Sequence, residues 1–186
     1  MALTPAQLTT LKNDIIANNN QIGGIAIKDM PHSADNAAAI SDWYNLLASP
    51  DYWVWDTAVT RARIYNQVGS TGTTWDWTFY KNQSVPEQNA WTQMFMGDQA
   101  NFSLLNLRVG ISKIFTSGSS VNRDHAFAVG RRQAKRVEKV FAIAVSNPPV
   151  SSGNTAADPR GATTNPDVMG FDGSLSYQDV QAAWNS

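Results

Sequence analysis

Residues 84–97, SVPEQNAWTQMFMG, carry the clearest structural signal in the chain. Ser84 and Glu87 form a capping box, in which the two side chains satisfy free N–H groups at the start of a helix. Pro86 stands within the first turn, where its fixed φ angle suits a helix. Apolar residues then follow at helical spacing up to a terminating glycine, namely Ala90, Trp91, Met94, Phe95 and Gly97. This stretch therefore predicts an α-helix.

Similar signals recur on both sides of this helix. Near the start of the chain, Thr4 followed by Pro5 predicts a capped helix that Asn18-Asn19-Asn20 and two glycines end. Helical spacing of apolar residues predicts further helices at about residues 35–47, 106–115, 121–129, 133–145 and 176–184. We therefore expect a mainly α protein with a small helical-bundle domain.

The apolar positions also predict which helix faces are buried. For residues 35–47 the expected stripe consists of Ala38, Ala39, Trp43, Leu46 and Leu47. For the terminal helix, Ser176 and Asp179 resemble a capping box in which aspartate replaces the usual glutamate. The apolar face of that helix is Val180, Ala183 and Trp184.

The stretch from residue 52 to residue 80 is expected to hold a short β-hairpin. Tyr52-Trp53-Val54-Trp55 has the composition of a buried extended run. Farther along, Trp75, Trp77 and Phe79 alternate with polar residues, which is the period of a strand. Residues 69–72 between them have the composition of a turn.

The domain organisation predicted from composition is a helical core over residues 1–145 and an extended arm over residues 146–186. Prolines stand among Ser, Gly, Asn and Thr across residues 147–167, a composition that does not build a packed core. The arm then ends in the amphipathic helix at 176–184. A short helix on a tether is a good docking element, and the plainer interpretation is that it folds back onto its own domain.

Composition restricts the classes of protein that fit. The chain has no cysteine, which excludes disulfides and a thiolate nucleophile and suits a reducing cytoplasm. Charged residues make up 16% of the chain, below the average of about 25%, and there are 7 tryptophans. This combination fits a surface that is buried against other subunits, or a tryptophan-rich core. The start lacks the basic and apolar regions of a secretory signal, and no apolar run approaches the length of a membrane span.

No motif for catalysis, for a cofactor or for a metal stands out, so we expect a structural protein and not an enzyme. The histidines are His32 and His125, and neither has an orienting partner that the sequence reveals. Phosphate-binding loops, nucleophile elbows and zinc-protease motifs do not occur. The carboxylates show no spacing typical of a catalytic pair or an EF-hand.

The charges are distributed unevenly along the chain. Residues 108–139 carry eight Lys or Arg against two acids, a net charge of +6, and the remaining residues carry −7. Three interpretations stay open: a surface that binds the acidic face of another subunit, a surface that binds nucleic-acid phosphate, and a solvated helix face. Aromatic residues are absent from the densest part, residues 131–139. Their absence there weakens binding to single-stranded nucleic acid.

Several blocks of the sequence resemble a family of small proteins encoded in structural gene clusters of tailed bacteriophages and prophages. The blocks are NRDH at 122–125, AVGRR at 128–132, Ala134, Arg136, Glu138-Lys139, Phe141-Ala142 and DVMGFDGSLSYQDVQAA at 167–183. The opening residues 1–12, the segment at Trp53 to Thr57 and Ala90-Trp91 are also similar. Residues 146–165 look like an insertion relative to this pattern. The resemblance implies a virion morphogenesis protein, and it supplies no catalytic residues.

Within that setting, the helices, the low charge and the terminal helix favour a head–tail connector subunit, an adaptor or neck protein. Such a subunit docks on the portal as a ring, so its expected partners are further copies of itself, the portal and a tail-side neck or tail protein. A passing contact with genomic DNA is expected, and no cofactor and no membrane. The expected location is the head–tail junction of the virion, after assembly in the host cytoplasm.

The residues expected at protein interfaces are Tyr177, Val180, Trp184, Arg131, Arg132 and Arg136. Deletion of residues 174–186 is expected to abolish docking on the portal while the core stays folded. The alternative functions are a capsid decoration or minor capsid protein, and a DNA-packaging accessory factor outside the virion. A strand-dominated fold would favour decoration, and salt-sensitive DNA binding through Arg131, Arg132, Lys135 and Arg136 would favour the accessory factor.

Overall fold

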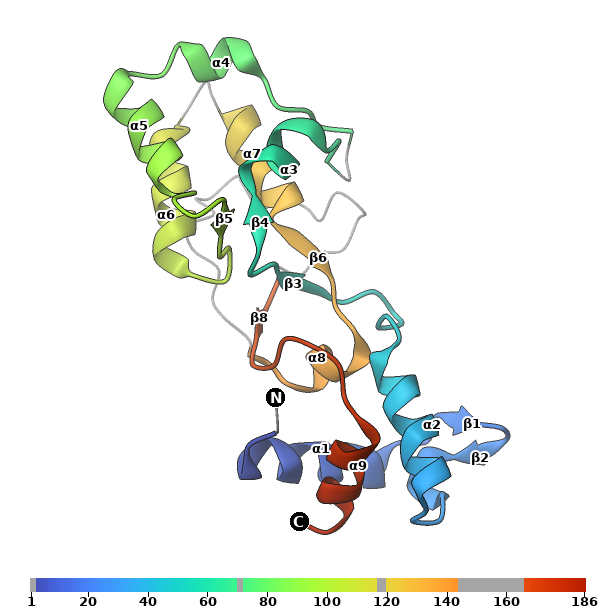
Figure 1. The fold of residues 1–186 in the computed structure, drawn as a ribbon. Coiled ribbons are helices and arrows are strands. Elements are labelled where there is room, and N and C mark those ends of the chain that lie inside the picture. The colour runs from blue at the N-terminus through green and yellow to red at the C-terminus, as the bar shows by residue number, and fades with distance from the viewer. Residues whose placement is uncertain (1–2, 70–71, 117–119, 144–165) are drawn as a thin grey trace. The chain divides into compact units, whose positions relative to one another are not determined.

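The computed structural model describes residues 3–69, 72–116, 120–143 and 166–186. The chain divides into two compact units. Unit 1 comprises Met1–Tyr52, Gln133–Ile143 and Met169–Ser186, and unit 2 comprises Trp53–Arg132 and Ala144–Val168. The described residues are mainly helical with short strands (Figure 1), which confirms the predicted fold class.

Unit 1 is built from helices at both ends of the chain and from a short segment in its middle. Its elements are α1 (Pro5–Ala17), β1 (Gln21–Ile22), β2 (Ile25–Ala26), the 3₁₀ turn Ile27–Asp29, α2 (Ala34–Asn45), α8 (Arg136–Val140), β7 (Ala142–Ile143) and α9 (Tyr177–Trp184). Strands β1 and β2 form an antiparallel hairpin, with Ile22 opposite Ile25. Thr4 caps α1, as the Thr4-Pro5 signal predicts, and the structure adds Gln7 as the second member of a capping box.

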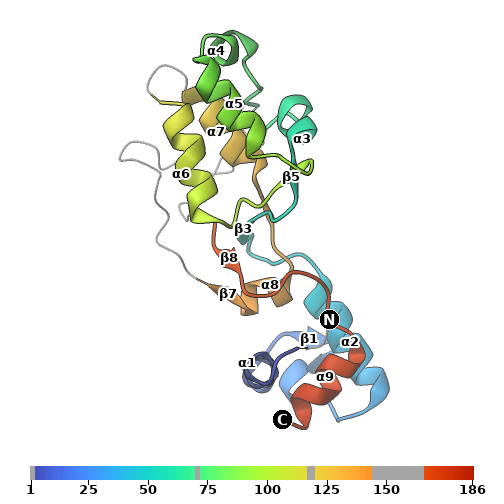
Figure 2. The ribbon, with the colours of Figure 1, turned by 60° about the vertical axis from the view of Figure 1, so that its left-hand side comes forward.

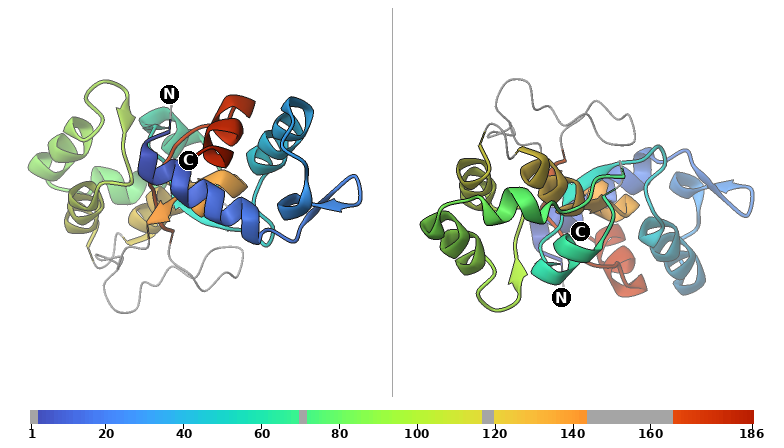
Figure 3. Two further views of the ribbon diagram at one scale, coloured as in Figure 1. Left: turned by 90° about the horizontal axis from the view of Figure 1, so that it is seen from below. Right: turned by 90° about the horizontal axis from the view of Figure 1, so that it is seen from above.

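The core of unit 1 lies where α1, α2 and α9 pack together, as Figures 2 and 3 show. Leu11 of α1, Ile40 of α2 and Val180 of α9 are fully buried. The capping box of α9 forms between Ser176 and Asp179, so the predicted helix is confirmed. Helix α9 is part of this core because its Val180 and Ala183 have no exposed surface.

This packing corrects the predicted division of the chain. The sequence predicted a core over residues 1–145 and an extended arm over residues 146–186. The structure instead groups Met169–Ser186 with the N-terminal residues, because the apolar face of α9 is covered by α1 and α2. Residues 144–165 of the predicted arm lie outside the described residues.

The predicted buried face of α2 is only partly correct, because Ala39 and Trp43 pack against the core of unit 1 but Ala38 is exposed. The residues without exposed surface are Ala37, Ile40 and Tyr44, with Ser41 beside them. Leu46 and Leu47, which the stripe included, are more than half exposed. The helix ends at Asn45, so these two leucines no longer follow the helical period.

Unit 2 contains the remaining elements. They are β3 (Trp53–Trp55), β4 (Val59–Thr60), α3 (Arg61–Asn66), α4 (Trp77–Lys81), α5 (Val85–Gln93), β5 (Gln99–Ala100), α6 (Leu105–Ile114), α7 (Ser120–Val129), the first two residues of β6 (Arg131–Gln133) and the first residue of β8 (Val168–Met169). Strands β4 and β5 pair antiparallel, with Val59 opposite Ala100. Helices α5 and α6 lie side by side in Figures 1 and 2.

The predicted β-hairpin is wrong. Strand β3 confirms the extended run at Trp53–Trp55, but its partner is β6. The alternating residues Trp77 and Phe79 lie in helix α4, because the Asp76 side chain caps that helix by accepting from the Thr78 and Phe79 N–H groups. A local cap therefore outweighs the apparent strand period.

The helix predicted at 133–145 is shortened to α8. The Ala134 N–H donates to the Tyr52 carbonyl, and the Ala134 carbonyl accepts from the Ala48 N–H, at 2.8 and 2.9 Å. These bonds to another segment keep the backbone before Arg136 extended. The fully buried Glu138 side chain then accepts from the Lys135 N–H at 2.8 Å, at the start of α8.

Aromatic rings dominate the core of unit 2. Trp75 contacts Trp91, Phe115 and Tyr65, with ring centroids 5.1, 5.6 and 5.0 Å apart. The Trp91 Nε1–H donates to the Tyr65 hydroxyl at 3.0 Å, which satisfies its only polar atom. A tryptophan-rich core therefore accounts for much of the aromatic content of the chain.

His125 in this core is expected to make the protein less stable in mild acid. Its Nε2–H donates to the Ile64 carbonyl at 2.7 Å, its Nδ1 lies 3.1 Å from the Thr73 hydroxyl, and the ring has no exposed surface. Burial lowers the pKa of His125 below its ordinary value of 6.5. The unfolded chain therefore binds the proton first, and stability falls as the pH drops below about 6.5, by at most about 1.4 kcal/mol per pH unit.

Urea unfolding between pH 5 and pH 8 measures this dependence. His125→Gln keeps a donor near the Ile64 carbonyl and removes the titration, so the acid loss of stability should shrink in that variant. An identical pH dependence in both proteins would contradict the assignment.

Candidate functional site

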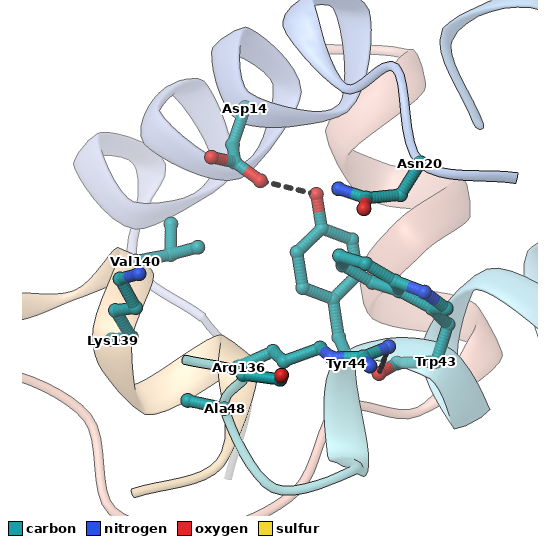
Figure 4. Close-up of a pocket in the computed structure, with 9 residues that line it drawn as sticks. Asp14, Asn20, Trp43, Tyr44, Ala48, Arg136, Lys139 and Val140 are labelled. Atoms are coloured by element: carbon teal, nitrogen blue, oxygen red, sulfur yellow. Dashed lines mark hydrogen bonds between the residues drawn. The ribbon is translucent and has the colours of Figure 1, made fainter. Parts of the chain in front are cut away.

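A pocket of about 300 Å³ lies within unit 1 and is a candidate functional site. Its lining comes from α1, from α2 and the residues that follow each of these helices, and from α8. The lining residues are Asp14, Asn20, Trp43, Tyr44, Ala48, Ser49, Arg136, Lys139 and Val140. Figure 4 shows Asp14 entering from α1, and Arg136 and Lys139 coming from α8 on the other side.

One wall of the pocket is a hydrogen-bonded chain around Tyr44. The Tyr44 hydroxyl donates to Asp14 Oδ2, drawn as a dashed line in Figure 4, and accepts from Asn18 Nδ2 at 3.3 Å. Asn18 Oδ1 in turn accepts from the side-chain amide of Asn20 at 2.7 Å. Burial, and then the bond to Asp14, raise the pKa of Tyr44 well above its usual range. Tyr44 therefore remains a protonated donor that holds the Asp14 carboxylate in place.

The opposite wall carries two cations. The Arg136 guanidinium lies over the Trp43 ring, 4.1 Å from its centroid, and its Nη1 donates to the Trp43 carbonyl at 3.3 Å. Lys139 is exposed, and its Nζ lies 5.5 Å from the Tyr52 ring centroid. Among the residues that the structure describes, neither Arg136 nor Lys139 forms an ion pair with a carboxylate.

This arrangement is suited to binding a charged ligand. A carboxylate and two cations face one cavity without pairing with one another, and stacking or hydrogen bonds already orient Asp14 and Arg136. Within residues 3–69, 72–116, 120–143 and 166–186, no group of three His, Asp or Glu side chains is placed to hold a metal ion.

The predicted interface residues of α9 differ in their exposure to solvent. Tyr177 is 44% exposed at the start of the helix, and Val180 is fully buried in the core of unit 1. The Trp184 ring is half-buried and stacks on His32, with centroids 4.3 Å apart. Tyr177 is therefore available to a partner, Val180 is not, and Trp184 is partly covered by its own unit.

Several side chains of the predicted basic cluster are buried or bonded within their own unit. Arg131 is 5% exposed and lies over the Trp53 ring, and Arg132 is half-buried and makes contacts of its own. Both belong to unit 2, whereas Arg136 lines the pocket of unit 1. Lys135 Nζ donates to the Gly173 carbonyl at 3.0 Å and to the Ser174 hydroxyl at 2.7 Å. Much of this charge is therefore engaged within the protein.

Sequence reasoning missed Asp14, Asn20 and Tyr44 as site residues. Apolar spacing places Trp43 in a buried stripe, and the charge pattern places Lys139 in the basic segment without a specific role. No local motif joins Asp14 to Tyr44, which are thirty residues apart. A corrected helical register for α2 would have placed Tyr44 on the buried face, where a hydroxyl needs a partner.

Comparisons with known proteins supply no relative for this site: no family model, no curated protein and no solved structure matches the chain. None of the helices in the described ranges combines the length and apolarity needed to cross a bilayer.

Tyr44→Phe is expected to lower the free energy of unfolding by about 1–2 kcal/mol, since Asp14 and Asn18 each lose a partner that is largely shielded from water. The raised pKa adds a second signature. Below pH 10 both the folded and unfolded hydroxyls are protonated, and above it the unfolded chain loses its proton first, so stability falls.

Urea unfolding at pH 7.5 and pH 10.5 tests both effects. The alkaline loss should be smaller in Tyr44→Phe than in the native protein. Tyr177→Phe, at an exposed tyrosine, is the matched control and should change neither value. Equal effects of the two substitutions would contradict the role of Tyr44.

Proposed function

We propose that the protein is a head–tail connector subunit of a tailed-phage virion, which docks on the portal as a ring of copies. The observation that carries this proposal is the use of the phage-like sequence blocks. In both units, their side chains and glycines are used to build the fold. Such a use is expected of a structural subunit, which acts through its folded shape and its contacts and catalyses no reaction.

In unit 2 the block that begins at Asn122 joins helix α7 to its surroundings. Asn122 Oδ1 accepts from the Asp76 N–H at 2.8 Å, and Asn122 Nδ2 donates to the Asp76 carbonyl at 2.9 Å. Gly130 packs against the Phe102 ring so closely that a Cβ atom would lie 2.1 Å from a ring carbon. These residues and His125 therefore have structural reasons for their identity.

The part of the second block that lies in unit 1, residues 169–183, has the same character. A Cβ atom at Gly170 would lie 2.4 Å from the Phe141 carbonyl oxygen, and the Phe171 ring packs on Phe141 with centroids 5.6 Å apart. Leu175 is buried, and its N–H donates to Asn45 Oδ1 at 2.8 Å. These contacts support a structural subunit and assign no reacting group.

The helical fold favours a connector over a capsid decoration protein, because decoration proteins are more often β-rich. The buried Arg131, the engaged Lys135 and the stacked Arg136 disfavour a DNA-packaging factor that uses this segment as a free basic surface. Residues 131–139 therefore support the structural role.

The distribution of charge is also compatible with a ring. Unit 1 carries five Lys or Arg against eight acids, and unit 2 carries nine against seven. A ring needs heterologous contacts, in which one surface binds a different surface of the next copy. Opposite net charges on the two units provide complementary partners for such a contact.

The test is quantitative mass spectrometry of purified virions, with the portal protein as the internal reference. A ratio near one copy per portal subunit, or a small multiple of it, is expected. A copy number that rivals the major capsid protein would assign a decoration role. Absence from the particle would overturn both virion functions and leave the accessory factor.

A second experiment asks whether Tyr177 contributes to docking. Purified protein and portal are mixed and analysed by size-exclusion chromatography, with Tyr177→Ala as the variant. Since this side chain is 44% exposed, its removal should leave the fold intact and weaken the complex. Gln178→Ala, at the neighbouring exposed position, is the control. Docking that is unchanged by Tyr177→Ala would remove Tyr177 from the interface.

A further inference from the structure

We propose that the pocket of unit 1 binds a small acidic amino acid. The proposal goes beyond the connector function and does not depend on it. It rests on the three charged side chains that face the cavity: Asp14 from α1, and Arg136 and Lys139 from α8.

The charges of the pocket define the ligand. Arg136 and Lys139 have no carboxylate within ion-pair distance among the described residues, so each can donate to a carboxylate of a ligand. Asp14 has two carboxylate oxygens, of which Oδ2 accepts from Tyr44, so the group retains capacity for a ligand ammonium group. A ligand with two carboxylates and one ammonium matches these groups one for one.

The cavity is suited to a ligand of this size. Its volume of about 300 Å³ lies at the lower end of the range typical of small-molecule sites. Asn20 and Ser49 add polar groups to the lining, and Ala48 and Val140 add apolar surface for the methylene groups of a short side chain. Both an anion-only and a cation-only ligand would leave at least one charged wall unmatched.

Two of the three binding groups, Asp14 and Arg136, are already held in position. The Trp43 ring and the Trp43 carbonyl orient the Arg136 guanidinium, and Tyr44 orients Asp14. Because these side chains are ordered before the ligand arrives, less conformational entropy is lost on binding.

The test is isothermal titration calorimetry on the full chain with glutamate and with glutarate, which has both carboxylates without the ammonium group. We expect the native protein to prefer glutamate by about tenfold or more, the effect of one charged hydrogen bond. Asp14→Asn should abolish this preference, because it removes the negative charge that pairs with the ammonium group. The same change removes the repulsion between Asp14 and the carboxylates of either ligand.

Two further variants separate the cationic wall from general damage. Lys139→Gln should weaken both ligands by about tenfold, and its exposed position keeps the fold intact. Lys28→Gln changes an exposed lysine of unit 1 outside the pocket and should alter neither affinity. Equal affinity for the two ligands, a preference that survives in Asp14→Asn, or no binding at millimolar concentration would each overturn the proposal. None of these results depends on the copy number in the virion.

Discussion

Deletion of residues 174–186 is expected to unfold unit 1. The sequence predicted that this deletion would only release a docking tail, but Leu175, Val180 and Ala183 lie in the core, each at most 5% exposed. Burial of a valine or leucine side chain contributes about 1.5–3 kcal/mol, and the faces of α1 and α2 that α9 covers would also meet water. Such a loss is comparable with the total stability of about 5–15 kcal/mol that is typical of a domain.

Urea unfolding followed by circular dichroism, together with an NMR spectrum, tests the deletion. The truncated chain should lose the native signals of α1 and α2 while those of unit 2 persist. Val180→Ala is a milder version and should lower stability, whereas Gln178→Ala, at an exposed position of the same helix, should not. Native signals of α1 and α2 in the truncated chain would show that α9 is dispensable for folding.

Trp91→Ala is expected to destabilise unit 2 by about 3–5 kcal/mol. Trp91 has no exposed surface and contacts the rings of Trp75, Phe95 and Phe115, with centroids 5.1, 4.8 and 5.2 Å away. Its removal leaves a cavity between α5, α6 and the Trp75 segment. It also takes away the N–H group that donates to the Tyr65 hydroxyl, so both packing and hydrogen bonding are lost.

Graded variants separate these two losses. Trp91→Phe keeps part of the packing and removes the hydrogen bond, and Tyr65→Phe removes the acceptor and keeps both rings, so each should cost less than Trp91→Ala. Trp77→Ala, at a ring that is 54% exposed, is the control for loss of a tryptophan. In urea titrations, the free energy of unfolding should fall most in Trp91→Ala and less in Trp91→Phe and in Tyr65→Phe. A Trp91→Ala variant as stable as Trp77→Ala would contradict the central place of Trp91.

Local chemistry explains which elements were predicted correctly. The first helix, the helix at 85–93 and the terminal helix each begin with a side chain that bonds the backbone three residues away, at Thr4, Ser84 and Ser176. These bonds lie within a few residues of one another, so their signal is present in the sequence itself. The mainly α fold class followed from several such signals.

The errors arose where distant segments compete with local preference. The helix predicted at 133–145 is cut short because Ala134 bonds to Tyr52 and Ala48. The predicted β-hairpin fails because strand β3 pairs with β6, about eighty residues away, and because Asp76 caps α4. The spacing of apolar residues indicates whether a segment has the period of a helix or a strand, but it does not show which other segment pairs with it.

The candidate site likewise combines a feature that the local sequence shows with contacts between distant segments. The basic segment predicts Arg136 as an interface residue, but in the pocket it meets residues of helices α1 and α2. The charge of Arg136 can be read from the sequence alone. Its position over Trp43 and across from Asp14 requires the chain to return to unit 1 after residue 132.

The sequence by itself determined the helical character of this protein, the positions of its capped helices and the uneven placement of its charges, because caps, spacing and charge are properties of neighbouring residues. Only the tertiary structure decided that α9 belongs to a core, that Arg131 is buried and that Asp14, Tyr44, Arg136 and Lys139 share one pocket. Burial and convergence depend on contacts between residues far apart in the chain, and these contacts form only when the apolar faces of several elements are covered together.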